Sequence, residues 1–312
     1  MSQDRPSRRT VIRALAAGAA GALLRPYAAL AAAPLGATPL SRPIPSSGEK
    51  LPVVGLGTWI TFNVGDDAVL RDEAAGVMKA FFDAGGRVID SSPMYGSSQE
   101  VVGYGLAKLS RRGDVFSADK VWIGSGEDGP AQIEESRSHW GIRRFDLLQV
   151  HNLLAWEEHL PRLLDMKAAG RLRYVGITTS EGRRHEEIVQ IMATRPIDFV
   201  QVSYNVLDRE VERRILPLAG EKGIAVLVNR PFRQGALTRE LEPHPLPAFA
   251  GEMGAATWAQ LLLKFIISHP AVTCVIPATT RPAHAVENVA AATGELPDES
   301  LRQRLVEHVE RL

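Results

Sequence analysis

Short runs rich in β-branched residues alternate with amphipathic stretches along most of this chain, and the alternation constrains the fold more than any other feature. Eight of the runs predict strands, at residues 53–58, 87–92, 115–121, 146–152, 174–180, 199–205, 225–231 and 274–279. Apolar residues three and four apart predict helices at residues 68–84, 100–109, 132–140, 157–169, 186–193, 210–222 and 257–268. Eight strands in alternation with helices favour a single α/β domain, a closed (β/α)8 TIM barrel.

An open doubly wound sheet is the main alternative to the barrel. Such a sheet binds dinucleotides through a G-x-G-x-x-G motif between its first strand and the following helix. Gly55 and Gly57 supply only the first two glycines, and no helix follows at once. The barrel is therefore the better interpretation, and residues 298–312 predict one extra surface helix capped by Asp298.

Composition excludes several classes of function. The 36 Lys and Arg residues balance the 36 Asp and Glu residues, so the zero net charge gives no support to a nucleic-acid-binding surface. Cys274 is the single cysteine, which excludes an internal disulfide. No CxxC pair or Cys/His cluster has the spacing of a zinc site, so we expect no metal.

The first 31 residues differ in character from the rest. Arg8 and Arg9 precede an apolar run from Ala14 to Leu24, which is too short to be a stable membrane anchor. A small-x-small pattern follows at residues 29–31. The segment resembles a bacterial twin-arginine export signal, which implies the twin-arginine machinery as a partner and a periplasmic location. A basic tail ahead of an Ala-rich helix is the alternative.

Four polar side chains follow three neighbouring predicted strands. Asp90 and Tyr95 lie at the end of the second strand, Lys120 is in the third, and His151 ends the fourth. In a barrel the carboxyl ends of the strands meet at one mouth, where the chemistry occurs. Each residue alone has an ordinary structural explanation, but the set predicts an active site.

Several motifs resemble those of the aldo-keto reductases. They are the runs 55–59, 90–96, 149–152 and 276–282, together with Lys120 and the Glu287-Asn288 pair. The resemblance covers nearly the whole chain after the export-signal-like segment at residues 1–31. It implies a barrel at residues 51–312, preceded by a linker and N-terminal hairpin at residues 32–50.

The resemblance implies carbonyl reduction, in which a nicotinamide gives hydride to a carbonyl carbon and the oxygen takes a proton. Tyr95 is then the general acid, and we expect the Lys120 ammonium to lower the pKa of its phenol. Asp90 would keep Lys120 charged. His151 would hydrogen-bond the substrate carbonyl or relay its proton, as a neutral imidazole.

The resemblance also implies an NADP site. Arg281 and Thr279 suit a ribose 2′-phosphate, because an arginine fork matches phosphate geometry. Asn229 stands where many members have the tyrosine that stacks on nicotinamide, and Thr179 where many have asparagine. The expected cofactor-binding residues are Gly57, Thr58, Thr178, Gln201, Asn229, Arg230, Phe232, Gln234, Thr279, Arg281, Glu287 and Asn288.

Three tryptophans, Trp59, Trp122 and Trp156, follow predicted strands and are expected to line the pocket for a small carbonyl substrate. Two other functions stay open. One is a non-catalytic barrel that keeps its cofactor as a redox sensor or partner-binding subunit in the periplasm. The other is a lyase or epimerase that uses the same tyrosine and lysine without net redox change.

Overall fold

Eight parallel strands are hydrogen-bonded in chain order in the computed structural model, which describes residues 38–312. They are β3 (Leu56–Gly57), β4 (Val88–Asp90), β5 (Phe116–Val121), β6 (Leu147–His151), β7 (Tyr174–Thr178), β8 (Phe199–Ser203), β9 (Ala225–Asn229) and β10 (Val272–Val275). Bridges pair Val54 with Val275 and Gly57 with Ala278, so the last strand meets the first. This closure confirms the (β/α)8 barrel.

Closure of the barrel depends on a close backbone approach at Gly57. A Cβ atom added there would lie 2.8 Å from the carbonyl oxygen of Ile276. The amide of Gly57 donates to the carbonyl oxygen of Pro277 at 3.0 Å. Glycine is therefore required for packing at this predicted site residue.

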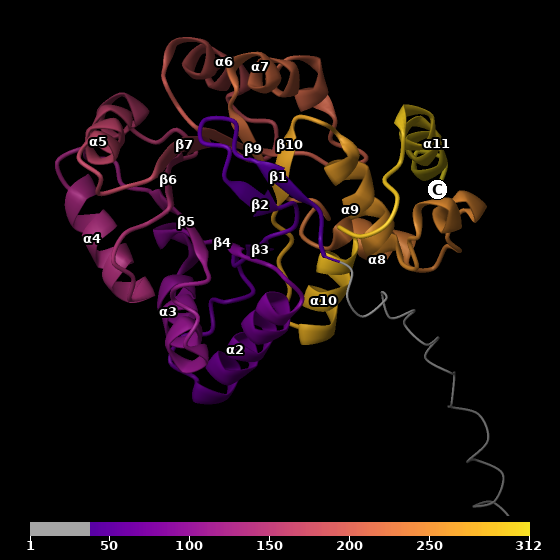
Figure 1. Ribbon diagram of the computed structural model, residues 1–312, viewed down its shortest axis with the longest axis horizontal. Helices are drawn as coiled ribbons and strands as arrows, with labels where there is room; N and C mark the ends of the chain where they lie inside the picture. The colour runs from indigo at the N-terminus through magenta and orange to yellow at the C-terminus, as the bar shows by residue number, and fades with distance from the viewer. Residues whose placement is uncertain (1–37) are drawn as a thin grey trace, which may run out of the picture. The chain divides into compact units, whose positions relative to one another are not determined.

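A ring of helices surrounds the strands (Figure 1). Its members are α2 (Ala68–Asp83), α3 (Ser98–Leu109), α4 (Gly129–Trp140), α5 (Trp156–Ala168), α6 (His185–Thr194), α7 (Ile215–Lys222), α9 (Trp258–Ser268) and α10 (Pro282–Ala290). Side-chain caps mark where helices begin: Asp67 accepts from the first turn of α2, and Thr257 from that of α9. The described part of the chain contains no helix long and apolar enough to cross a membrane.

The expected helix at residues 210–222 is interrupted. Glu210–Arg213 forms the 3-10 helix η2, Arg214 has a φ of −143°, and α7 begins at Ile215. Pro217 explains the break, because proline has no amide hydrogen and its ring clashes with the carbonyl four residues earlier. Two short elements of the loop before α9, α8 (Ala236–Leu241) and η3 (Ala248–Met253), were not predicted.

Side chains inside the barrel change from apolar to polar along the strands. Since strand side chains alternate between faces, Phe116, Ala118 and Lys120 of β5 all point inward. The amino-terminal layers form one buried apolar cluster that includes Val88, Phe116, Leu147, Tyr174, Phe199 and Leu227. Buried polar residues occupy the carboxyl-terminal layers. The predicted active site therefore lies at the polar, carboxyl-terminal end of the barrel.

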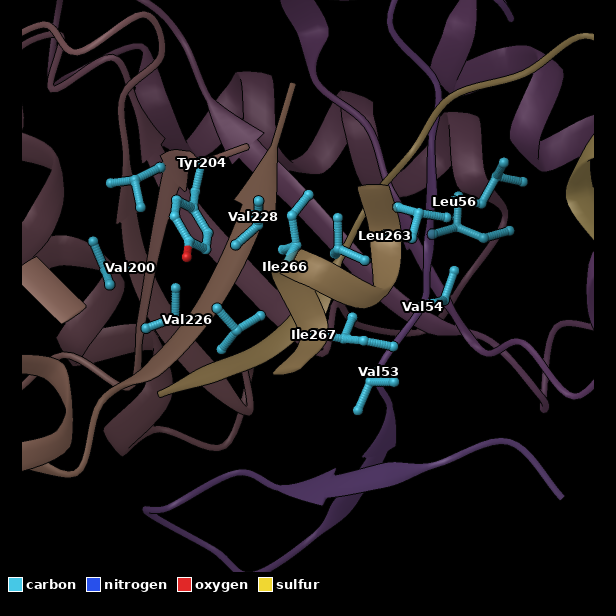
Figure 2. Close-up of a cluster of buried hydrophobic side chains, with 14 of the residues drawn as sticks. Val53, Val54, Leu56, Val200, Tyr204, Val226, Val228, Leu263, Ile266 and Ile267 are labelled. Carbon is cyan, nitrogen blue, oxygen red and sulfur yellow. The ribbon is translucent and has the colours of Figure 1, made fainter. Parts of the chain in front are cut away.

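A larger apolar core lies between the strands and the helices. Figure 2 shows Ile266 of α9 beside Val228 of β9, while Leu263 and Ile267 of the same helix lie toward residues 53–56. Apolar residues at these helical spacings cover the outer face of the sheet. This core fixes the strands, and with them the side chains at the barrel mouth.

Two elements lie outside the barrel. The hairpin of β1 (Ser41–Pro43) and β2 (Lys50–Pro52) packs Ile44 and Leu51 onto the amino-terminal apolar cluster. The additional helix α11 (Glu299–Val309) begins as predicted, because Asp298 accepts from the amide of Leu301 at 2.8 Å. The predicted export signal at residues 1–31 lies outside the described residues.

Candidate active site

Lys120 and Asp90 form a buried ion pair in the polar layer. Lys120 Nζ donates to Asp90 Oδ2 at 2.6 Å and to the carbonyl oxygen of Ser91 at 2.7 Å, and both charged side chains are almost fully buried. Burial is the largest single influence and acts to lower the pKa of Lys120, but attraction to Asp90, Tyr95 and Asp119 together outweighs it, so the pKa lies above its ordinary value. Lys120 is therefore a permanent cation at neutral pH.

Tyr95 is brought to the same place by a short turn after β4. It ends the 3-10 helix η1 (Pro93–Tyr95), which Ser92 caps, and the Lys120 ammonium lies 5.0 Å from the centre of the Tyr95 ring. Burial raises the pKa of Tyr95 to about 12, although Lys120 acts to lower it. The expectation that Lys120 lowers this pKa below the ordinary value is wrong for the net effect, because loss of water is the larger influence.

His151 completes the group of four. Its ring meets the Tyr95 ring edge-on, with the ring centres 5.7 Å apart, and its Nδ1 lies 2.7 Å from Ser92 Oγ. Burial, and secondly the Lys120 charge, lower the pKa of His151 to about 2. The imidazole is therefore neutral at neutral pH, as expected.

Further polar side chains tie this group to the neighbouring strands. Asp90 Oδ1 accepts from Gln201 Nε2 at 2.9 Å and from Gln149 Nε2 at 3.3 Å. Gln201 Oε1 in turn accepts from Thr178 Oγ1 at 3.3 Å and from Asn229 Nδ2 at 3.2 Å. Three predicted cofactor residues thus lie in one buried network with the ion pair.

Two residues of this buried polar network, which forms the floor of the barrel mouth, were not predicted as site residues. Gln149 lies two residues before His151, so strand alternation was the signal that places both inside the barrel. Ser203 Oγ donates to Asn229 Oδ1 at 2.7 Å and accepts from the amide of Glu181 at 3.0 Å. Thr58, which was predicted, donates to the carbonyl oxygen of Asp90 at 3.0 Å, and its hydroxyl is also hydrogen-bonded to that of Ser91 at 3.0 Å.

Asp119 is a buried carboxyl on the other face of β5 that was also missed. It accepts from Gln99 Nε2 at 2.9 Å, from Trp140 Nε1 at 2.5 Å and from the amide of Lys120 at 2.7 Å. Burial raises its pKa to about 7. Asp119 thus links β5, at the residue next to Lys120, to helices α3 and α4.

The loop after β9 contains the next predicted cofactor residues. Arg230 Nη1 pairs with Glu181 Oε1 at 2.8 Å, and Phe232 packs against the core. In the amide orientation that satisfies both groups, the oxygen of Gln234 accepts from Arg230 Nη1 at 2.6 Å. Arg230 and Gln234 have φ angles of 53° and 60°, so the loop turns sharply beside the strand ends.

The residues after β10 lie at the start of α10. Thr279 Oγ1 accepts from the amide of Arg281 at 3.1 Å, and Arg281 is exposed with no ion pair to any residue from 38 to 312. Glu287 accepts from Thr257 Oγ1 at 2.5 Å, and Asn288 is buried. Arg281 therefore offers an exposed cation at a helix start, where anions are favoured.

The three tryptophans have different surroundings. Trp59 lies beside Tyr95, with ring centres 6.5 Å apart, and Trp122 is 40% exposed after β5. Trp156 begins α5 and donates to Glu187 Oε1 of α6 at 2.6 Å. Of the three, Trp59 is thus the one beside Tyr95, whereas the hydrogen bond of Trp156 links helices α5 and α6.

One buried polar atom fits a ligand at this floor. Thr179 Oγ1 is buried and has no hydrogen-bond partner among residues 38–312. It follows β7 directly, and its carbonyl oxygen accepts from Asn229 Nδ2 at 3.0 Å. Buried polar atoms are normally paired, so this hydroxyl fits a polar ligand group, and Arg281, which has no ion pair within residues 38–312, fits an anionic one.

A profile of the aldo/keto reductase family matches residues 53–308. The methylglyoxal reductase YeaE of Escherichia coli is 29% identical over 258 residues, which cover 80% of this chain and 89% of that protein. An aldo/keto reductase from Klebsiella pneumoniae, solved with NADP and acetate, is 27% identical with a TM-score of 0.71, over 83% of this chain and 93% of the other. An NADPH complex from the same organism is 28% identical with a TM-score of 0.70, over 83% and 92%.

The chain belongs to the aldo/keto reductase family, whose profile spans almost the whole described barrel. It is an aldo-keto reductase, an enzyme class that reduces carbonyl groups with a nicotinamide cofactor.

Proposed function

We propose that this enzyme reduces a small aldehyde or ketone with NADPH, and that Tyr95 is its general acid. The observation that carries the proposal is the buried Lys120–Asp90 pair, which lies beneath Tyr95 and next to a neutral His151. A non-catalytic sensor would need neither an acid nor a neutral hydrogen-bond donor there. Similarity to proteins solved with NADP and NADPH favours reduction over a lyase or epimerase reaction.

Each residue has one task in this proposal. When bound, NADPH supplies the hydride that the carbonyl carbon receives. Tyr95 gives its proton to the carbonyl oxygen, which becomes the alcohol hydroxyl, and solvent later returns a proton to the phenolate. Lys120 stabilises the phenolate charge as it forms, and Asp90 holds Lys120 in place. His151 orients the carbonyl by a hydrogen bond.

Residues of this chain that would hold NADPH lie in three groups. Thr178, Thr179 and Gln201 offer polar atoms for the carboxamide at the barrel floor. Arg230 and Gln234 lie in the turning loop that would face the pyrophosphate. Arg281 would bind the ribose 2′-phosphate, because its guanidinium is exposed and lacks an ion pair among the described residues.

Methylglyoxal, a small dicarbonyl, is our first substrate candidate. The Escherichia coli relative is named a methylglyoxal reductase, and a second relative in that organism, 24% identical over 86% of this chain and 99% of its own length, is named an NADH-specific methylglyoxal reductase. Trp59, beside Tyr95, would contact the substrate.

Cofactor-dependent turnover tests the proposal. NADPH should be consumed when methylglyoxal is added, and a panel of larger carbonyls would define the pocket. Arg281→Ala should raise the KM for NADPH about 10- to 100-fold, the range expected for charged hydrogen bonds, and leave the KM for NADH unchanged. Arg143→Ala, at another exposed arginine, is the matched control. Absence of turnover with every carbonyl would contradict the proposal.

We also propose that residues 1–31 direct export through the twin-arginine machinery. The support is the sequence order of arginine pair, apolar run and small-x-small site. Replacement of Arg8 and Arg9 by lysine should keep the charge and retain the protein in the cytoplasm. Cell fractionation would measure this, and equal export of both chains would contradict it.

A further inference from the structure

Ser92 lies two residues after Asp90 and is completely buried. Its hydroxyl oxygen is 2.7 Å from His151 Nδ1 and accepts from the amide of Met94 at 3.2 Å. These are its two hydrogen-bond contacts among the described residues. The hydroxyl therefore lies between a backbone donor and the catalytic imidazole.

The positions of the protons follow from these two contacts. A hydroxyl has one proton to donate, and a neutral imidazole has a proton on one nitrogen and a lone pair on the other. Since the Met94 amide already donates to Ser92, the Ser92 proton needs an acceptor, and His151 Nδ1 is the atom in reach. If Nδ1 carried the imidazole proton instead, the buried hydroxyl proton would have no acceptor among residues 38–312.

We propose that Ser92 is a positioning residue that donates to His151 Nδ1 and so fixes the imidazole proton on Nε2. Nε2 makes no hydrogen bond to any other residue from 38 to 312, which leaves its proton available. The neutral charge of the ring, caused first by burial and then by Lys120, is required for this tautomer to exist.

The consequence for the reaction rests on the proposed function. The Nε2 proton would be donated to the same carbonyl oxygen that Tyr95 protonates. The opposite tautomer would direct a lone pair at that oxygen, and the two acceptors would repel each other. Ser92 therefore matters for turnover although it does not touch the substrate.

Nitrogen-15 NMR of the histidine-labelled full chain with NADPH tests the tautomer directly. The sequence has eight histidines, so the signals of His151 are assigned as those that disappear in the His151→Gln variant. We expect a protonated Nε2 and an unprotonated Nδ1 for His151. In Ser92→Ala we expect this preference to weaken and kcat/KM for the carbonyl to fall about 10- to 100-fold, the range found for partners that orient metal-bound histidines.

Two variants serve as controls. Ser92→Thr keeps the hydroxyl and should restore both the wild-type tautomer and most of the turnover. Ser117→Ala removes another buried hydroxyl, bonded to Asp146 at the far end of β5, and should change neither. Unchanged NADPH binding in Ser92→Ala would show that its effect lies in the reaction.

The wild-type spectrum decides the question even if Ser92→Ala does not fold. A His151 signal with the proton on Nδ1 overturns the proposal, as does a folded Ser92→Ala protein with the wild-type tautomer and rate. If Nε2 carries the proton but His151→Gln turns over at the wild-type rate, the tautomer assignment stands and the role of His151 in the proposed function fails.

Discussion

A charged lysine inside a barrel depends on its partners. Lys120 meets one carboxylate and one carbonyl oxygen, and Asp90 in turn accepts from two side-chain amides. A buried ion pair of this kind offsets its own desolvation only when the remaining polar atoms are also paired. The site is therefore stable as a complete network. Removal of one member leaves the desolvation free energy of its buried partners uncompensated.

Lys120→Met should lower the free energy of unfolding by about 3–5 kcal/mol, because the Asp90 carboxylate is left buried without its cation. Chemical denaturation at pH 7 would measure the change. Lys79→Met is the matched control, since Lys79 pairs with Asp83 at 2.5 Å but both side chains are exposed, and exposed pairs contribute little. Equal effects of the two variants would show that the buried pair is not special.

At the scale of elements, Asp119 connects β5 to two helices. Its pKa of about 7 lies above the value of 3.8 for a free aspartate, so between pH 4 and 7 the folded state binds a proton that the unfolded state does not. Stability from this group is present at low pH and is lost as the pH rises through 7.

Asp119→Asn should remove that dependence. The free energy of unfolding of the wild type and of the variant would be measured at pH 5 and pH 8. His151 contributes equally to both proteins, so its contribution cancels in the comparison. The wild type should lose more stability than the variant between the two pH values. A variant that loses as much as the wild type would contradict the assignment to Asp119.

A buried arginine, together with the apolar residues Leu305 and Val309, anchors the helix α11. Arg302 donates to Tyr204 Oη at 2.6 Å, to Glu212 Oε1 at 2.8 Å and to the carbonyl oxygen of Phe265 at 2.5 Å. Arg302→Ala should therefore lower the free energy of unfolding by about 3 kcal/mol, since it leaves these acceptors buried. Gln303→Ala, on the exposed side of the helix, should change stability little, and similar losses would contradict the anchoring role.

Much of this architecture was predictable from sequence because local patterns and the fold agree. The strand–helix alternation predicted the barrel, and strand ends predicted where Asp90, Lys120 and His151 would meet. The break at Arg214 was not predicted, although Pro217 was a visible signal. Ser92 was missed because a serine before proline is typical of a turn, and its contact with His151 joins residues 59 positions apart. The net pKa of Tyr95 depends on burial, which no local pattern reports.

At the scale of the whole molecule, the two ends of the barrel have different tasks. The amino-terminal end is apolar and closed by the β1–β2 hairpin, so it contributes stability (Figure 1). The carboxyl-terminal end collects the polar side chains of β4 to β9. This separation allows a buried lysine and a neutral histidine to lie together on a rigid scaffold.

The central claim is that the Tyr95 phenol protonates the substrate. Its most direct test is the rate of NADPH consumption with methylglyoxal by Tyr95→Phe, together with the affinity for NADPH. We predict a loss of about 10²- to 10⁴-fold in kcat with unchanged NADPH affinity, whereas Tyr104→Phe, which removes an exposed hydroxyl bonded to Asp72, keeps the wild-type rate. A Tyr95→Phe enzyme that reduces carbonyls at the wild-type rate would contradict the account.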